Sequence, residues 1–513
     1  MNLFKKGIKV RKLQKLNFFK TRDFKNIFYN LLSYLIVPVI SIISTPIFIK
    51  NLGLKNYGYW ILINSLIALL GVTNMGLGTA IINFGSRYLA KEEYYALNKV
   101  ISITLGISML LATAVTSFTF VIDKSSLSLV LGSSINQVDT NIIKFLGIIV
   151  GIKIITSVFA SIILAYQRYD INSRVNMFAN IGTVTLTTVL SGMGAHLNEL
   201  VLCLIFVSII TCIIFYMITC KIHDNFRIIF LFDGKLTKDI LKYGIYAWAQ
   251  VIINAMYTQM DKVIINAFLG PSALGIYSTC MQLAIKIHEI PGSVASYLFA
   301  KFSYIYEKGN IDQLKKEYYK ANIIVIMSTV LIGSTIFLFA NSILSVWINS
   351  DFSRNNTLLL RTLVISVTCG AVFIVPFYIY NSIRKVRLNT IFNFMLSIAS
   401  LSAAFVLIPR LGVIGSGYGR MVGLPIIILG VMYLENKLLN MQTTLKLSLI
   451  LLTTVYLLMG AGIEMFGEIK QDSLKILTIT SASYVIFFAT ILFAMYKLLN
   501  KSDKDVVNKT NAI

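Results

Sequence analysis

The chain has 513 residues, of which 56% are hydrophobic and only 13% are charged, and its formal net charge is +24 at pH 7. A soluble domain of average composition carries roughly 25% charged residues. The composition therefore excludes an ordinary soluble enzyme and predicts an integral membrane protein. The five cysteines show no metal-ligand spacing, so neither a metal site nor a disulfide framework is expected.

Apolar stretches of about 20 residues, long enough to cross the hydrocarbon core as helices, recur from residue 30 almost to the end of the chain. They predict fourteen transmembrane helices, at about 30–49, 59–82, 99–122, 142–165, 176–195, 198–220, 243–269, 273–300, 321–347, 361–382, 389–409, 412–434, 446–464 and 475–497. The connections are short. The three longest, 123–141, 221–242 and 301–320, have the composition of ordinary connectors.

The basic residues gather on one side of this topology. An even number of spans puts both termini on the same side, together with the basic segments 5–25, 221–242, 301–320 and 384–387. Cytoplasmic loops of membrane proteins carry an excess of Lys and Arg, so both termini are predicted to be cytoplasmic. Topology thus accounts for most of the net charge, and nucleic-acid binding is not expected.

Two segments far apart in the sequence share one pattern. In IFIKNLGLKNYGYW (47–60) and IINAFLGPSALGIYS (264–278), a span ends in Leu-Gly, a short turn follows, and the next span begins after Gly and Tyr. Leu52-Gly53 thus aligns with Leu269-Gly270, and six predicted helices separate the copies. The pattern predicts two parallel six-helix halves related by an axis along the membrane normal, with the substrate site at their interface near the midplane.

This repeat gives the predicted organisation of the chain. It consists of a basic cytoplasmic leader (1–28), an N-lobe (29–220), a cytoplasmic linker (221–242), a C-lobe (243–434), two extra helices (435–497) and a cytoplasmic tail (498–513). The leader mixes bases with Leu and Phe. It is expected either to lie along the anionic cytoplasmic leaflet or to be a basic tail that only enforces topology.

Three segments resemble a known family. The hairpin YTQMDKVIINAFLGPSALGIYS (257–278), the turn after the second span and IPRLGVIGSGYGRMVGL (408–424) resemble the polysaccharide-export branch of the MATE-like (MOP) flippase superfamily, especially Wzx-type O-antigen flippases. The resemblance covers roughly residues 27–435. It implies two helix bundles facing each other in a V that opens alternately to each side of the membrane. It also implies a cargo of undecaprenyl-diphosphate-linked oligosaccharide.

Polar residues share helical faces in the spans that open each half, because they recur every three or four positions. These residues are Gln250, Asn254, Tyr257 and Thr258 in the seventh span, Gln282 in the eighth, and Asn64 and Asn74 in the second. A polar stripe in lipid must face protein or water, so these residues are predicted to line a cavity between the lobes. Pro291-Gly292 is expected to kink or break the eighth span.

Six charged residues are predicted inside the spans. They are the bases Lys153, Lys262, Lys286 and Arg420 and the acids Asp261 and Glu289. A charge at mid-membrane costs at least about 2.5–3.5 kcal/mol on insertion scales, so each needs a partner or water. The excess of positive charge favours an anion, and a diphosphate suits it because its oxygens accept several charge-assisted hydrogen bonds. The two acids are candidates for coupling to protons or Na⁺.

Several of these charges also have a structural interpretation. Lys262 can extend its stem outward along the helix, and Lys286 and Glu289, three residues apart, can neutralise each other. Lys153 has no acid within four residues, so it either reaches a partner on another helix or meets the substrate. His288 lies beside Lys286 and is weak evidence for a proton carrier.

Arg420 has a structural alternative of its own. It follows Gly415 and Gly419, with Gly423 beyond. Small residues spaced in this way let another helix backbone approach closely. Arg420 is therefore either a ligand for the anion or a hydrogen-bond donor at a packing site.

The chain shows no nucleotide-binding or catalytic motif. The predicted function is a flippase that moves an undecaprenyl-diphosphate-linked oligosaccharide, for O-antigen or a similar polysaccharide, from the cytoplasmic to the periplasmic leaflet of a bacterial inner membrane. No cofactor is expected beyond H⁺ or Na⁺ coupling. The expected partners are membrane lipid and a polysaccharide polymerase with its chain-length machinery.

Two alternatives remain. A MATE-like multidrug/cation antiporter is disfavoured by the excess positive charge, because organic cations call for carboxylates and aromatics. A membrane-embedded glycan polymerase or transferase is disfavoured because it needs a loop with catalytic side chains.

Overall fold

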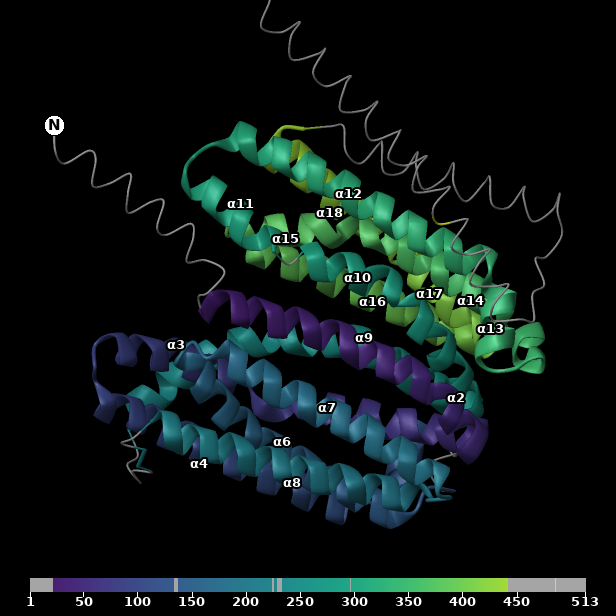
Figure 1. The fold of residues 1–513 in the computed structure, drawn as a ribbon, viewed down its shortest axis with the longest axis horizontal. Coiled ribbons are helices and arrows are strands. Elements are labelled where there is room, and N and C mark those ends of the chain that lie inside the picture. Colours follow the sequence, from purple (N-terminus) through teal and green to yellow (C-terminus); the bar gives the residue numbers. More distant parts are fainter. Residues whose placement is uncertain are drawn as a thin grey trace, which may run out of the picture. The chain divides into compact units, whose positions relative to one another are not determined.

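The computed structural model describes residues 22–132, 137–223, 226–227, 233–295, 297–441 and 485. Within these residues all regular elements are helices (Figure 1), and nine helical stretches are long and apolar enough to cross a membrane. The predicted all-α membrane fold is confirmed. The spans predicted at 446–464 and 475–497, most of the leader and the tail at 498–513 lie outside the described residues.

The chain divides into two compact units, Met1–Ala267 and Phe268–Ile513. The helices of the first unit are α2 (Arg22–Gly71), α3 (Leu77–Ala90), α4 (Tyr94–Val121), α5 (Lys124–Leu131), α6 (Thr140–Ala165), α7 (Tyr169–Gly192), α8 (Leu197–Ile222) and the first part of α9 (Gly234–Ala284), with a short turn η2 (Val72–Asn74) before α3. The apolar helix α6 packs against α2, α3, α4, α7 and α8. The connector expected at 123–141 contains the short helix α5, which sequence analysis did not predict.

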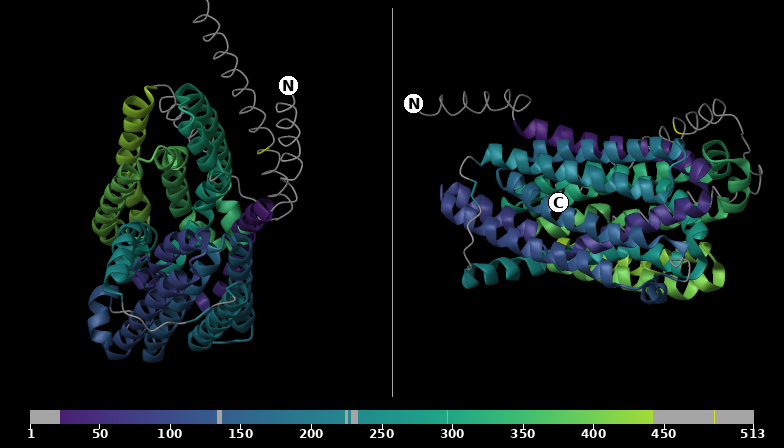
Figure 2. Two further views of the ribbon diagram at one scale, coloured as in Figure 1. Left: turned by 90° about the vertical axis from the view of Figure 1, so that its left-hand side faces the viewer. Right: turned by 90° about the horizontal axis from the view of Figure 1, so that it is seen from below.

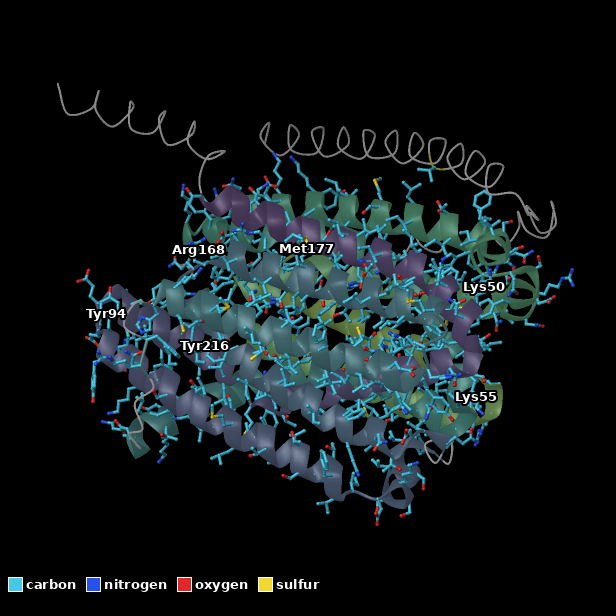
Figure 3. All side chains as sticks on the ribbon, turned by 60° about the horizontal axis from the view of Figure 1, so that its bottom comes forward. Lys50, Lys55, Tyr94, Arg168, Met177 and Tyr216 are labelled. Atoms are coloured by element: carbon cyan, nitrogen blue, oxygen red, sulfur yellow. The ribbon has the colours of Figure 1, made fainter. Side chains whose placement is uncertain are left out.

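The chain runs back and forth within the first unit. Lys50 and Lys55, on either side of the turn in α2, lie at one end of this unit, and Tyr94 and Arg168 lie at the other end (Figure 3). In Figure 2 the blue and teal helices of this unit run alongside one another. This up-and-down arrangement is what the predicted spans and their short connections require.

The second unit contains the rest of α9, α10 (Lys286–Ala295), α11 (Leu298–Glu307), α12 (Ile311–Leu338), α13 (Ala340–Trp347), α14 (Ser350–Gly370), η4 (Ala371–Phe373), α15 (Ile374–Ser382), α16 (Val386–Leu411), α17 (Ile414–Val422), α18 (Leu424–Tyr433) and the π-helical η5 (Leu434–Leu439). The predicted eighth span is divided among α9, α10 and α11. Pro291 and Gly292 lie inside α10, and the interruptions fall at Ile285 and near Tyr297. The expected interruption of this span is present, but it falls on either side of Pro291 and Gly292 and not at these residues.

The helices of the two halves repeat at a constant offset. The helices α4 and α12 each have 28 residues and begin at Tyr94 and Ile311, an offset of 217 residues. The same offset separates the starts of α7 and α16, at Tyr169 and Val386. It also relates α8, Leu197–Ile222, to the helical stretch Ile414–Leu439.

The backbone repeats as well. Gly53 has φ 75° and ψ 160°, and Gly270 has φ 81° and ψ 178°, so each interrupts a long helix with the same unusual conformation. Other residues with positive φ also pair at an offset of 217 or 218: Glu92 with Gly309, Gln167 with Arg384, and Gly194 with Gly412. The repeat predicted from the two Leu-Gly turns therefore extends through both halves. The predicted limits of the lobes and linker remain predictions.

Gly53→Ala and Gly270→Ala are each expected to destabilise the protein by about 1–3 kcal/mol, because this backbone region is essentially restricted to glycine. An added Cβ would meet no atom within 4 Å at either position, so the effect would come from backbone strain. The midpoint of thermal unfolding in detergent measures it. Gly182→Ala, on a regular helix and equally open, is the control; an equal loss in this variant would contradict the interpretation.

Candidate functional site

Lys153 lies at the middle of α6 and is the one exposed residue of this helix between Ile142 and Ala165. All its neighbours along this stretch are buried or half-buried. Within the described residues, no hydrogen bond or ion pair to the Lys153 side chain is recorded. From Ala165 at the end of α6, Lys153 is about 18 Å along the helix axis. A basic residue thus has the one exposed position in this apolar stretch of α6.

Asp261 and Lys262 are consecutive residues of α9 with different surroundings. Asp261 is only 5% exposed, whereas Lys262 is half-buried and its Nζ donates to Gln259 Oε1 at 3.0 Å. Helical side chains lean toward the N-terminus of their helix, and this contact draws Lys262 away from the turn at Gly270. The outward extension considered for Lys262 is therefore not the conformation observed.

The polar stripe of α9 changes in exposure along the helix. Gln250, Asn254 and Thr258 are exposed, Tyr257 is half-buried, and the stripe ends at the buried Asp261. The Thr258 hydroxyl donates to Asn254 O at 2.8 Å. The exposed residues of the stripe thus offer amide and hydroxyl groups. The carboxylate of Asp261 lies at the other, buried end of the stripe.

Close backbone contacts hold this part of α9 in the first unit. A Cβ added at Gly76 would lie 2.4 Å from Gly244 O, and one added at Gly132 would lie 2.6 Å from Ala267 O. Asn266 Nδ2 also donates to Leu131 O at 2.7 Å. Glycine is required at residues 76 and 132 because no side chain fits between the two backbones.

Of the two asparagines predicted on the second span, Asn74 has a structural contact. Its Oδ1 accepts a hydrogen bond from Gly76 N at 3.2 Å, at the break between η2 and α3. Asn64 is exposed, and its Nδ2 donates to Trp60 O at 2.8 Å. Asn64 therefore has the exposure expected of a lining residue, whereas Asn74 stabilises the break.

In the second unit, Lys286 and Glu289 form the ion pair that their spacing allows. The Lys286 side chain is 16% exposed and that of Glu289 is 47% exposed. Gln282, one turn earlier, is half-buried. The pair leaves no net charge at this point of α10.

Arg420 lies on α17, and its Nε donates to the hydroxyl of the buried Tyr277 at 3.3 Å. The glycines before it pack against α16 as predicted. A Cβ added at Gly415 would lie 2.5 Å from Leu407 O, and one added at Gly419 would lie 2.9 Å from Ala404 Cα. The close helix approach is confirmed, and Arg420 has a contact of the kind expected at a packing site.

Sequence analysis missed two buried acids at helix ends. Asp170 is held by Arg168 and Arg174, with an Arg174 Nη2–Asp170 Oδ2 distance of 2.8 Å. The i,i+4 spacing of Asp170 and Arg174 on one helix could have indicated this pair. Glu435 accepts a hydrogen bond from the Tyr318 hydroxyl at 2.8 Å, and no sequence signal connects these two residues.

The structure thus brings Lys286 to Glu289 and Arg420 to Tyr277, and it places Lys262 beside Gln259. Lys153, Asp261 and Lys262 belong to the first unit, and Lys286, Glu289 and Arg420 belong to the second. Their convergence on one cavity remains a prediction. In the described parts of the chain, no group of three or more His, Cys, Asp or Glu side chains is arranged to hold a metal ion.

The fold is similar to those of two solved transporters. The lipid II flippase MurJ in an inward closed conformation has a TM-score of 0.71 at 13% identity, covering 91% of this chain and 99% of MurJ. An inward-facing multidrug resistance MATE family transporter of the MOP superfamily has a TM-score of 0.59 at 14% identity, covering 84% and 99%. The chain therefore has the same type of fold as these two membrane transporters.

The polysaccharide biosynthesis protein family matches residues 24–300, more than half of the chain. The chain belongs to this family. A Shigella flexneri protein named "Putative O-antigen transporter" is 19% identical over 404 residues, which cover 76% of this chain and 92% of that protein. These similar proteins are named as transporters or flippases and not as enzymes.

Tyr277→Phe separates the two interpretations of Arg420. If Arg420 binds the transported molecule, Arg420→Ala should lower transport by about tenfold or more, because a hydrogen bond to a charged group contributes about 1.5–3 kcal/mol. Tyr277→Phe removes the hydroxyl that accepts the 3.3 Å bond from Arg420 and should leave transport within about threefold, since interhelical hydrogen bonds in membranes average about 0.6 kcal/mol. The measurement is the transport rate of each variant in proteoliposomes, compared with that of the wild-type protein. Equal losses in the two variants would assign Arg420 a packing role.

Proposed function

We propose that this protein is a flippase for an undecaprenyl-diphosphate-linked oligosaccharide, the repeat unit of an O-antigen or a similar surface polysaccharide. The proposed direction is from the cytoplasmic to the periplasmic leaflet of a bacterial inner membrane, with both termini in the cytoplasm. Membership of the polysaccharide biosynthesis protein family supports the class of cargo. The names of the Shigella flexneri relative and of MurJ support movement of a lipid-linked saccharide.

The observation that carries this proposal is the exposure of the residue Lys153 on an otherwise covered apolar helix. An isolated charge at this depth is costly unless water or an anion compensates it. A diphosphate compensates several positive charges at once, because its oxygens accept charge-assisted hydrogen bonds from Lys and Arg. Lys153 is therefore the first of the four bases that we assign to the diphosphate, together with Lys262, Lys286 and Arg420.

The polar residues around the bases suit the sugars. Exposed amide and hydroxyl groups of Gln250, Asn254, Thr258 and Asn64 supply both donors and acceptors for sugar hydroxyls. In the proposed mechanism the diphosphate and sugars occupy a wet cavity, the polyprenyl chain stays in lipid, and the lobes open alternately to each side. No nucleotide or other cofactor enters this mechanism.

Coupling to an ion is proposed at the two acids. Protonation of Glu289 would end its ion pair with Lys286 and free that ammonium for the diphosphate, whereas deprotonation would restore the pair and favour release. Asp261 is buried beside Lys262 and is the second candidate. A proton or Na⁺ gradient could therefore change the affinity for the cargo without any chemical change in it.

Two other functions make different predictions. A multidrug/cation antiporter would move organic cations, which the four bases do not favour. A glycan polymerase or transferase would alter its substrate chemically. A polysaccharide polymerase and its chain-length machinery are instead proposed as partners that use the delivered repeat units.

Reconstitution in liposomes with a labelled undecaprenyl-diphosphate-linked oligosaccharide tests the proposal. The accessibility of the label in each leaflet should change with time, and the labelled molecule should stay chemically intact. Lys153→Ala should slow this movement by about tenfold or more, through the loss of at least one charge-assisted hydrogen bond. Lys153→Arg should keep most of the activity, because arginine also donates to phosphate oxygens.

Lys55→Ala is the matched control, because it removes one lysine from an exposed turn at the end of the first unit. It should transport like the wild-type protein. If the Ala variants of Lys153, Lys286 and Arg420 all flip the lipid-linked saccharide as fast as the wild-type protein, these residues do not bind the diphosphate. Efflux of organic cations, or modification of the glycan, would instead support one of the two alternatives.

A further inference from the structure

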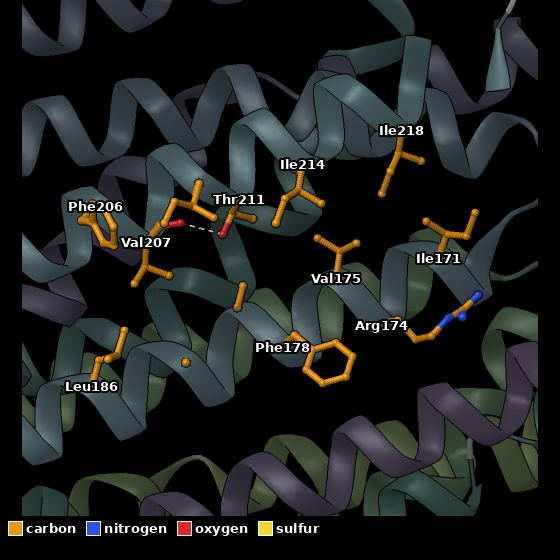
Figure 4. A pocket seen from close by; sticks show the side chains of 13 residues that line it. Ile171, Arg174, Val175, Phe178, Leu186, Phe206, Val207, Thr211, Ile214 and Ile218 are labelled. Carbon is orange, nitrogen blue, oxygen red and sulfur yellow. Dashed lines mark hydrogen bonds between the residues drawn. The ribbon is translucent and has the colours of Figure 1, made fainter. Parts of the chain in front are cut away.

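A groove runs between α7 and α8 of the first unit (Figure 4). It has a volume of about 670 Å³. Its lining is apolar apart from Arg174 and Thr211, and the Thr211 hydroxyl donates to Val207 O of its own helix at 2.7 Å. Figure 4 shows Leu186 and Phe206 toward one end of the groove and Arg174 at the other. The groove therefore offers apolar surface along its length and a charged group only at one end.

The charged end carries an excess of one positive charge. Arg168 Nε lies 3.0 Å from Asp170 Oδ1, and Arg174 Nη2 lies 2.8 Å from Asp170 Oδ2. The two arginine side chains are 34% and 40% exposed, while the carboxylate between them is buried. Burial alone would raise the pKa of Asp170, but hydrogen bonds and charge from Arg168 and Arg174 outweigh it and hold that pKa below its ordinary value. Asp170 thus stays ionised and orients both guanidinium groups.

The length of the groove matches one leaflet of a bilayer. Its α7 side extends from Ile171 to Leu186, which is about 22 Å along a helix axis. Half of a bilayer with its headgroup region is about 20–22 Å thick. A molecule whose head lies at Arg174 would therefore have its chains end near the midplane. A polyprenyl chain of undecaprenyl length would extend beyond the groove.

We propose that this groove binds one glycerophospholipid with an anionic head group. The phosphate lies against the guanidinium groups of Arg174 and Arg168, and the acyl chains follow Val175 and Phe178 on α7 and Ile210 and Ile214 on α8. Arginine suits this contact because its planar fork donates two parallel hydrogen bonds to phosphate oxygens. The arginines lie at the end of the unit predicted to be cytoplasmic, where anionic lipid attracts basic groups. The site is independent of the proposed flippase function.

Lipid retention tests this proposal. The full-length protein is reconstituted in nanodiscs with equal amounts of phosphatidylglycerol and phosphatidylethanolamine, extracted, and examined by native mass spectrometry. The wild-type protein should retain one phosphatidylglycerol in preference to phosphatidylethanolamine. Arg174→Gln should lower that retention by about tenfold, as expected for the loss of a hydrogen bond between charged groups.

A second variant tests the groove itself. Gly182 lines the groove, and a Cβ added there meets no atom within 4 Å. Gly182→Leu should therefore fill the groove without disturbing the fold and should also lower phosphatidylglycerol retention. Gly106→Leu, at an equally open and exposed glycine on α4, is the matched control and should retain the lipid. Thermal unfolding of each variant in detergent verifies that it is folded.

Three results would overturn the proposal. The first is wild-type retention of phosphatidylglycerol in both Arg174→Gln and Gly182→Leu. The second is equal retention of the two phospholipids by the wild-type protein, which would indicate unselective lipid contact. The third is a polyprenyl phosphate held at the site after purification from cell membranes. None of these results depends on whether the protein flips a lipid-linked saccharide.

Discussion

A charge or hydrogen-bonding group in the hydrocarbon core must find a protein partner or water, and this constraint accounts for the contacts that many polar side chains of the fold make. Glu435 is 1% exposed and accepts a hydrogen bond from Tyr318. Many serine and threonine hydroxyls donate to a carbonyl one turn earlier in their own helix, as Thr104 does to Val100 O at 2.8 Å. Charges near the helix ends pair with each other, as Arg168, Asp170 and Arg174 do.

Lys153 departs from this pattern, and the proposed function gives a reason for its departure. The surrounding helix is among the most apolar of the chain and packs against five neighbours, yet the lysine is exposed at its middle. A charged lysine at such a position destabilises the protein if it faces lipid, and it is favourable if it faces water and an anion. In the proposed function, the diphosphate of a lipid-linked saccharide supplies such an anion.

Much of the fold could be predicted because its turns need particular residues. The Leu-Gly turns at Gly53 and Gly270 identified the repeat, since their backbone conformation is open to glycine and to almost no other residue. Apolar length then placed most helices to within several residues. The helix α5 was missed because eight residues are too few for a hydrophobic period, and the interruptions around α10 were misplaced because Pro291 is accommodated inside that helix.

The candidate site was less predictable than the fold. The charges of the spans could be read from the sequence, and the pairing of Lys286 with Glu289 followed from their spacing. The contacts of Lys262 with Gln259 and of Arg420 with Tyr277 depend on rotamers and on packing between distant segments. The groove between α7 and α8 was not predicted, because its two walls come from different helices and only their packing forms it.

The decisive measurement is the water accessibility of residue 153. In a variant with the five native cysteines replaced, Lys153→Cys should react quickly with a water-soluble, membrane-impermeant thiol reagent, and an undecaprenyl-diphosphate-linked oligosaccharide should slow the reaction. Phe206→Cys, at a 60% exposed residue of the apolar groove, should react slowly under the same conditions. If both variants are equally inert, residue 153 faces lipid, and the anion-binding role assigned to it is wrong.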